Sequence, residues 1–174
     1  MERPTPFTLT SDMRAIVDAA HLAFIATVSP DGTPNLSPKG TIRVLDEGRL
    51  FYLDIASPRT RENLRRDPRV VLNVVDQVSR RGYRFVGRAT LHAGDALAGS
   101  CVARVAAEEG TAYSVACVVV VKVEEGEALV SPGYWHLEDE RQMRAWWRAR
   151  RAQLDAAFEA FLASREPWTR DTRS

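Results

Sequence analysis

Residues 49–76 read RLFYLDIASPRTRENLRRDPRVVLNVVD and carry the signals that set the fold. The first seven are rich in aromatic and branched apolar residues, which favours a strand. Pro58 suits the first position of a helix with Ser57 as its cap, and Pro68 stops that helix. The last eight residues form a nearly continuous apolar run, typical of a strand buried on both faces. The stretch therefore predicts a strand, a short helix and a second strand.

The segments on either side extend this pattern. Turn signals at 29–32 and 46–48 separate three strands whose loops are too short for crossover helices, which favours an antiparallel meander. Gly87 indicates a bulge or bend within a strand, as barrels need at their corners. Strands are predicted at 21–28, 33–45, 49–55, 69–76, 83–91 and 112–124, and helices after Thr10 or Ser11, at 58–67, from Asp95 to about 109 and at 138–163. The predicted fold class is α+β and mainly β, a small six-stranded antiparallel barrel with peripheral helices and a long C-terminal helix.

Bulk composition narrows the class of protein. The 174 residues are expected to form one domain spanning 1–174, and the net charge of +1 gives no overall attraction to nucleic acid or to anionic lipid. Two cysteines without CxxC spacing favour buried thiols in a reduced, cytoplasmic compartment. No signal peptide or membrane span is expected, and the three histidines have no metal-ligand spacing, so no metal site is predicted.

An anion site is one interpretation of the start of the 58–67 helix. Arg59, Thr60, Arg61 and Asn63 occupy its first turns, where free backbone N–H groups and the helix dipole favour a phosphate. The arginines could add charge-assisted hydrogen bonds. The alternative is an exposed basic helix face with an ordinary cap, and the spacing alone leaves both open.

A second candidate is the segment 37–42, Ser-Pro-Lys-Gly-Thr-Ile. A central strand would avoid Pro38 and Gly40, so this stretch is expected at a sheet edge or beside a groove. Lys39 could bond an electron-rich ring, a carbonyl or a phosphate there. A plain edge strand protected by lysine and proline explains the same residues.

The remaining motifs are less informative. The GxSxG, P-loop and GxGxxG patterns are missing, which removes the usual support for hydrolase, triphosphatase and Rossmann functions. The pairs Glu108-Glu109 and Glu124-Glu125 suggest turns that face solvent. Trp146 and Trp147 are interpreted as core residues or dimer anchors. A nucleic-acid binder that uses the arginine-rich helices is disfavoured by the near-neutral charge and the lack of a binding motif.

In the order of its motifs, the chain resembles the pyridoxamine 5′-phosphate oxidase-like family of FMN-binding split-barrel proteins. The similarity covers roughly residues 12–150, and order and spacing carry it more than any single motif. The similar segments are AFIATVSPDGTPNLSPKG at 23–40, FYLDIASPRTRENLRRDPRVVLNV at 51–74, YRFVGRATL at 83–91 and SPGYWHLEDERQMRAWW at 131–147.

The resemblance implies a split barrel that forms a homodimer, with FMN in each of two clefts between the subunits. It implies that Gly82 stands where true pyridoxamine phosphate oxidases have a flavin-binding glutamine, and that the arginine and histidine set for pyridoxal phosphate is missing. Vitamin B6 synthesis is therefore not expected. The cofactor-binding residues implied are Ser37, Pro38, Lys39, Gly40, Thr41 and Ile42; Tyr52 and Leu53; Arg59, Thr60, Arg61 and Asn63; and Ser131, Tyr134 and Trp135.

The leading hypothesis is thus a cytoplasmic FMN-dependent oxidoreductase that acts on an unidentified small molecule, without a nucleic-acid or membrane partner. No side chain is singled out as a catalytic acid or base. The alternative is a non-catalytic carrier or sensor of flavin, F420 or haem on the same fold. F420 stays open because its phosphate and polyglutamate tail would suit the basic helical segment 59–66.

Overall fold

The computed structural model describes residues 6–164, apart from the side chain of Leu162. The chain divides into two compact units, one up to Val130 and one from Ser131 onward, and each is considered by itself. Among the described helices, none combines the length and the apolar character that crossing a bilayer requires.

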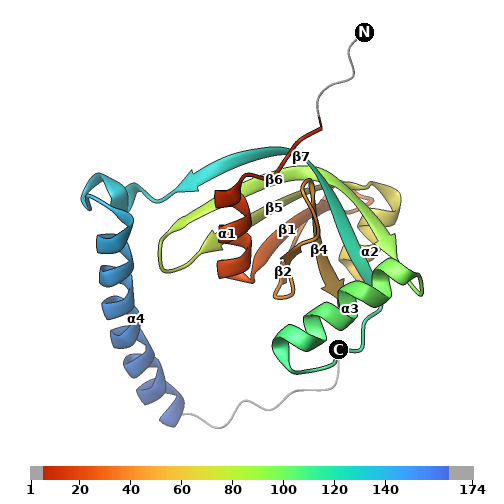
Figure 1. Cartoon of the computed structure of the whole chain (residues 1–174). Coiled ribbons are helices and arrows are strands. Elements are labelled where there is room, and N and C mark those ends of the chain that lie inside the picture. The colour runs from red at the N-terminus through yellow and green to blue at the C-terminus, as the bar shows by residue number, and fades with distance from the viewer. Residues whose placement is uncertain (1–5, 165–174) are drawn as a thin grey trace. The chain divides into compact units, whose positions relative to one another are not determined.

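The first unit is a curled antiparallel sheet with three helices (Figure 1). Along the sheet the strand order is β2-β1-β5-β6-β7-β4-β3, so the two edge strands follow each other in sequence. The α+β, mainly β class predicted from the sequence is confirmed. Its elements are α1 (Ser11–Ala20), β1 (Ala23–Val28), β2 (Pro34–Lys39), β3 (Arg43–Val44), β4 (Arg49–Asp54), α2 (Pro58–Arg66), β5 (Arg69–Asp76), β6 (Arg81–His92), α3 (Ala96–Glu109) and β7 (Cys117–Val130).

The sheet has seven strands, and the prediction of six was wrong because the segment 33–45 is not one strand. It breaks at residues 40–42, after Pro38, which has no N–H to donate, and at Gly40. The first part, β2, pairs with β1, and the second part, β3, pairs with β4. The predicted three-strand meander is therefore wrong as well, since the break sends the two parts to opposite edges of the sheet.

β6 and β7 form the longest pairing of the sheet. β7 begins at Cys117 and extends to Val130, later than the predicted 112–124, because it pairs along the whole of β6. Glu124 and Glu125 consequently lie within the strand and not in a turn. The register shifts between Val86 and Gly87, which confirms the predicted irregularity.

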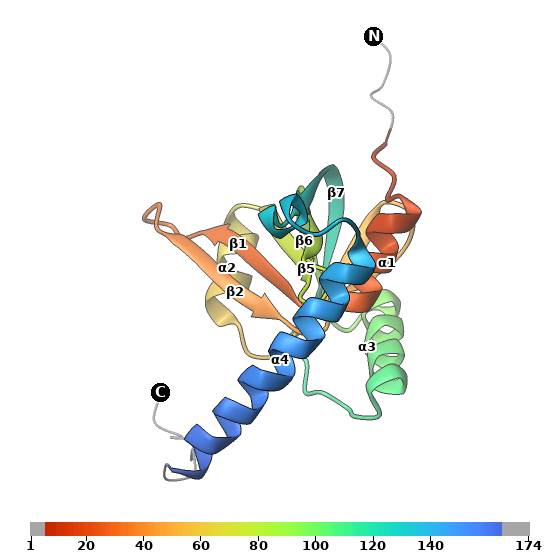
Figure 2. The same ribbon diagram turned by 90° about the vertical axis from the view of Figure 1, so that its left-hand side faces the viewer.

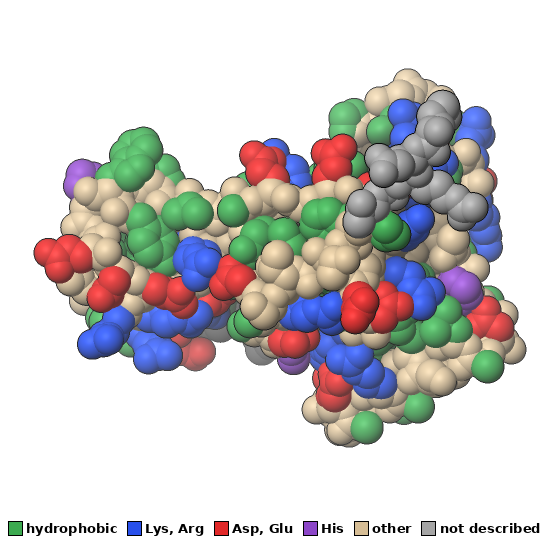
Figure 3. Space-filling model, turned by 45° about the horizontal axis from the view of Figure 1, so that its top comes forward, with side chains coloured by type: hydrophobic (Ala, Val, Ile, Leu, Met, Phe, Trp, Pro, Cys, Tyr) green, Lys and Arg blue, Asp and Glu red, His purple; other side chains and the backbone are tan. Residues whose placement is uncertain are grey.

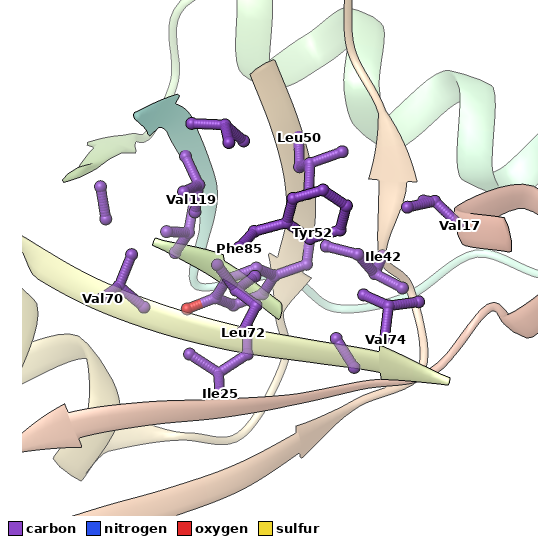
Figure 4. Packing of buried hydrophobic residues seen from close by; sticks show 14 of the residues in the cluster. Val17, Ile25, Ile42, Leu50, Tyr52, Val70, Leu72, Val74, Phe85 and Val119 are labelled. Atoms are coloured by element: carbon purple, nitrogen blue, oxygen red, sulfur yellow. The ribbon is translucent and has the colours of Figure 1, made fainter. Parts of the chain in front are cut away.

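Two apolar clusters hold the first unit together. The larger one fills the inside of the curled sheet and includes Val17 of α1, Tyr52 of β4 and Phe85 of β6 (Figure 4). The smaller one lies between the sheet and α3 and includes Phe51 and Leu53, which are the neighbours of Tyr52 along β4. Because successive strand residues point to opposite faces, β4 contributes to both clusters.

Among the described residues of the first unit, none provides such cover for the outer face of β1, β2 and β5. Along β5, alternate residues are buried and the others are only half-buried, so the prediction of a strand buried on both faces does not hold within one chain. On the neighbouring strands Phe24, Val28 and Leu36 are 45%, 52% and 65% exposed. We call Phe24, Val28 and Leu36 the outer apolar face.

The second unit consists of the 3-10 helix η1 (Pro132–Trp135) and the helix α4 (Glu140–Ala163). Ser131 starts η1, since its Oγ accepts a hydrogen bond from the Gly133 N–H at 3.2 Å. Met143 in the first turns of α4 is buried. The indole rings of Trp146 and Trp147 meet edge to face, with centroids 4.8 Å apart.

Candidate cofactor cleft

A cleft of about 290 Å³ opens where β2 ends and α2 begins. The interruption between β2 and β3 leaves backbone outside the strands at one wall of the cleft, and the β4–α2 connection forms the other wall. Its lining residues are Pro38, Lys39, Gly40, Thr41, Leu53, Ile55, Ala56, Ser57, Glu109 and Tyr113. Five of these, the segment 38–41 and Leu53, were expected from the sequence to contact the cofactor.

Lys39 is the cation of this cleft, although only 5% of its surface is exposed. Its Nζ donates hydrogen bonds to the Oγ atoms of Ser37, at 2.9 Å, and of Ser57. The Nζ also lies 5.5 Å from the ring centroid of Tyr52, within range of a cation–π interaction. Burial lowers the pKa of Lys39, while the charge of Asp54 opposes that shift. The ammonium is therefore held in a fixed position at the cleft wall.

The N-terminus of α2 reaches the cleft with its first N–H groups uncapped. Ser57 occupies the N-cap position and Pro58 follows it, as predicted, but the Ser57 side chain makes no capping hydrogen bond. Its Oγ accepts from Lys39 instead. Free N–H groups beside a fixed ammonium form a site for an anion.

The Arg61 side chain forms an ion pair with Asp54 and is therefore not free to bind an anion in the cleft. Its guanidinium donates to Asp54 at 2.7 Å, and Asp54 is 1% exposed. The other Asp54 oxygen accepts from the Ser57 N–H at 3.0 Å. Arg61 thus neutralises the carboxylate that holds the start of α2 in place.

Thr60 and Asn63 lie on the buried side of α2. The Asn63 side-chain amide donates to Thr27 Oγ1 at 3.0 Å, and Asn35 donates to both Thr27 and Thr60 at 3.0 and 3.2 Å. These bonds attach α2 to the β1–β2 hairpin, beside which it lies (Figure 2). In this structure their side chains support the helix, so a cofactor contact of Thr60 or Asn63 would have to use backbone.

Arg59 lies on the other side of the helix start. Its exposed guanidinium lines a neighbouring surface cavity of about 420 Å³, together with Asp31 and Glu62. Within the described part of the chain it makes no hydrogen bond or ion pair. Of the two arginines predicted to hold a phosphate, only Arg59 is free to do so without breaking an ion pair.

Five lining residues were not predicted to contact a cofactor, and two of them, Glu109 and Tyr113, come from a distant part of the sequence. Glu109 ends α3, and its carboxylate accepts from Arg43 at 2.7 Å and from the Tyr113 hydroxyl at 2.6 Å. These two bonds, that of Tyr113 foremost, lower the pKa of Glu109 below its usual range. Arg43 is 1% exposed and also pairs with Glu108 at 2.7 Å. The glutamate pair is exposed to solvent, as predicted, but it ends the helix α3 and does not form a turn. Only the single arginine in an otherwise apolar stretch, 42–45, hinted at such a partner.

The other predicted residues lie elsewhere. Ile42 and Tyr52 are fully buried in the larger core cluster, and neither lines the cleft. Ser131, Tyr134 and Trp135 belong to the second unit. Their contact with a cofactor stays a prediction.

Comparisons with known proteins agree with this arrangement. The pyridoxamine 5′-phosphate oxidase family model matches residues 9–130. HupZ of Group A Streptococcus is 28% identical over 70% of this chain and 94% of its own, with a TM-score of 0.63. A candidate pyridoxamine 5′-phosphate oxidase from Lactobacillus delbrueckii is 30% identical over 73% of this chain and 99% of its own, with a TM-score of 0.60. Among curated proteins there is no significant match.

Solved structures with lower identity share the fold. An FMN-binding protein from Syntrophomonas wolfei, an F420 reductase and HutZ, the haem storage protein of Vibrio cholerae, are 13%, 16% and 17% identical. Their TM-scores are 0.59, 0.56 and 0.56, and they cover 68–71% of this chain and 87–98% of their own. At this identity the likeness concerns the fold alone.

Proposed function

Because this chain belongs to the pyridoxamine 5′-phosphate oxidase family, we propose that it is an FMN-dependent oxidoreductase that works as a homodimer. The observation that carries the proposal is the position of Lys39, a buried cation in a cleft that the uncapped end of α2 also borders. The FMN-binding protein of the same fold supports the choice of cofactor.

The polar groups around the start of α2, in the cleft and in the neighbouring cavity that Arg59 lines, fit a flavin phosphate. The free N–H groups at the start of α2 and the unpaired guanidinium of Arg59 are donors without a partner of their own in the described chain. Helix N-termini and arginines are the usual phosphate ligands of proteins. Arg61 would assist only through its charge, since its hydrogen bonds go to Asp54.

The wall formed by 38–41 and Leu53 fits the flat ring system. Gly40 exposes backbone without a side chain, and an added Cβ there would meet nothing within 4 Å. Lys39 Nζ can donate a hydrogen bond to an oxygen or nitrogen atom at the edge of the ring. When bound, FMN would supply hydride or electron transfer, and the protein would supply binding, orientation and charge.

A second copy of the chain is expected to complete the site. The outer apolar face lies partly on β2, the strand that ends at the cleft. We infer that the partner covers this face, buries the second side of β5 and closes the cleft.

The substrate is a small molecule other than pyridoxine phosphate. At Gly82, the position expected to differ from true pyridoxamine phosphate oxidases, an added Cβ would lie 2.2 Å from the carbonyl oxygen of Val74. No larger side chain fits there without moving backbone. A nucleic-acid partner is not proposed, since acidic and basic side chains are interspersed on the face shown in Figure 3.

Cofactor binding is tested by absorption spectroscopy and FMN titration of the purified chain. The variant Lys39→Met should weaken FMN binding by about tenfold to a hundredfold, the value of one charge-assisted hydrogen bond. The other lysine, Lys122, is exposed on β7, so Lys122→Met is the matched control and should bind FMN normally. A chain that binds no FMN, or a Lys39→Met variant equal to this control, would overturn the assignment.

A carrier or sensor role is the second candidate, supported by the haem storage protein and the F420 reductase that share the fold. Turnover separates the two functions. An oxidoreductase should have its bound FMN reduced by NADH or NADPH, or by another donor, and reoxidised by an acceptor. FMN that binds tightly but does not exchange electrons, or a preference for F420 or haem in competition, would favour the carrier.

A further inference from the structure

We propose that two copies of the chain pair through antiparallel α4 helices, so that Phe158 and Phe161 of each copy occupy a cavity at the start of the other copy's α4. The inference concerns the second unit alone and goes beyond the proposed cofactor function.

α4 presents an apolar face that is exposed in the described part of the chain. Trp146, Leu154, Phe158 and Phe161 are 48–56% exposed. Trp147, Leu154 and Phe161 follow one another at intervals of seven residues, which is close to two helical turns and typical of a helix that packs on another helix. Such an exposed apolar face on a helix indicates a partner.

The two ends of this face are complementary in shape. At the start of α4 lies a cavity of about 350 Å³, lined by Ser131, Gly133, His136, Leu137, Met143, Trp146 and Trp147. Toward the other end, the Phe158 and Phe161 rings stack with centroids 6.1 Å apart and project outward. Only an antiparallel arrangement brings the aromatic pair of one copy to the cavity of the other.

The charges beside the apolar face select the same direction. Arg144, Arg148, Asp155 and Glu159 are spaced by four, seven and four residues, so they lie along one side of the helix. Two antiparallel copies bring these sides together and place basic first halves opposite acidic second halves. In a parallel pair these sides would lie at opposite edges of the interface, and none of the four residues would face its charge partner.

One register satisfies both charge pairs. A two-fold axis that passes between residues 151 and 152 places Arg148 opposite the partner subunit's Asp155. It also places Arg144 opposite the partner subunit's Glu159. Within one helix, Arg144 pairs with Glu140 at 2.8 Å and Asp155 pairs with Arg151 at 3.8 Å. Both ion pairs are exposed, so Arg144 and Asp155 can also pair with charges of a second copy at little cost in free energy.

The same register seats the aromatic pair without further adjustment. It places Phe158 opposite position 145 of the other copy and Phe161 opposite position 142, beside the cavity residues Met143 and Trp146. Shape and charge are separate observations, and they agree on direction and register.

Disulfide trapping in the full chain tests the pairing. The variants Arg144→Cys and Glu159→Cys should form a disulfide-linked dimer when they are mixed under mild oxidation, but each should link poorly to itself. Ala149→Cys, on the opposite side of α4, replaces Arg144→Cys in the control mixture and should not link. The native Cys101 and Cys117 are buried. Self-linking at least as strong as in the mixture, or a mixture no better than the control, overturns the proposal.

Charge reversal gives a second, independent measurement by sedimentation equilibrium at low salt. Arg148→Glu and Asp155→Arg should each weaken self-association by about tenfold, and the double variant should restore it. Lys39→Met should lose FMN affinity and keep this self-association, so failure here is distinguishable from failure of the proposed cofactor. If the reversals leave association unchanged while α4 binds anionic phospholipid vesicles or a different protein, the proposed pair does not form.

Discussion

The hydroxyl group of Tyr52 allows a quantitative prediction about stability. The residue is fully buried, and its oxygen has no hydrogen-bond partner among the described residues. Figure 4 shows the ring surrounded by apolar side chains that include Ile25, Leu72 and Phe85. Burial therefore raises the pKa of Tyr52 far above its usual range, and the phenol stays neutral.

The variant Tyr52→Phe removes this hydroxyl and keeps the ring. A buried polar group without a partner costs about 1–3 kcal/mol, so the free energy of unfolding should increase by up to that amount. For a chain of this size each kcal/mol raises Tm by roughly 2–4 °C. The cation–π contact with Lys39, at 5.5 Å, needs only the ring and should survive.

Urea denaturation followed by circular dichroism measures the change. Tyr113→Phe is the matched control, because the hydroxyl of Tyr113 donates to Glu109 at 2.6 Å. It should lower the free energy of unfolding by about 0.5–1.5 kcal/mol. If Tyr52→Phe destabilises the protein as the control does, the Tyr52 hydroxyl has a partner in solution and the reasoning is refuted.

Three further predictions concern stability. Arg43→Met should lower the free energy of unfolding by about 1–3 kcal/mol in urea titrations, less than for a fully buried pair because its two carboxylate partners reach solvent. Gly87→Ala should lower the midpoint of thermal unfolding, since the added Cβ would lie 2.2 Å from a backbone carbonyl oxygen. In Gly99→Ala, within α3, the added Cβ would meet open space, so this variant should raise the midpoint slightly. Hydrogen bonds from Arg69 lower the pKa of Asp67 to about 2, so the contribution of this carboxylate to stability is present above pH 4 and is lost as the pH falls toward 2. Asp67→Asn should remove this pH dependence of the free energy of unfolding. An NMR titration in which the Asp67 carboxyl has its usual pKa would contradict the prediction.

Much of the first unit could be predicted because its signals are local. Pro58 and Pro68 delimit α2, Asp95 caps α3 through the Ala98 N–H, and Gly87 marks the irregularity between β6 and β7. Such signals depend on the backbone of a few neighbouring residues. The segment 38–41 was likewise expected beside a groove for a local reason, because proline and glycine do not suit a central strand.

Pairings between distant segments could not be predicted in this way. The separation of β2 from β3, the burial of Thr60 and the ion pairs of Arg43 all depend on which strands and helices become neighbours. A sequence shows that Arg59, Thr60 and Arg61 start a helix, but not which side of that helix faces the cleft.

The sequence alone thus determined the fold class, most of the helix and strand boundaries and the position of the segment 38–41 beside a groove. Tertiary structure alone decided that Lys39 and Glu109 share a cleft, that Thr60 and Asn63 support α2 from within, and that the aromatic residues of α4 remain exposed. The physical reason is that capping, turn formation and periodicity act over a few residues, whereas burial and charge pairing depend on the packing of the whole chain.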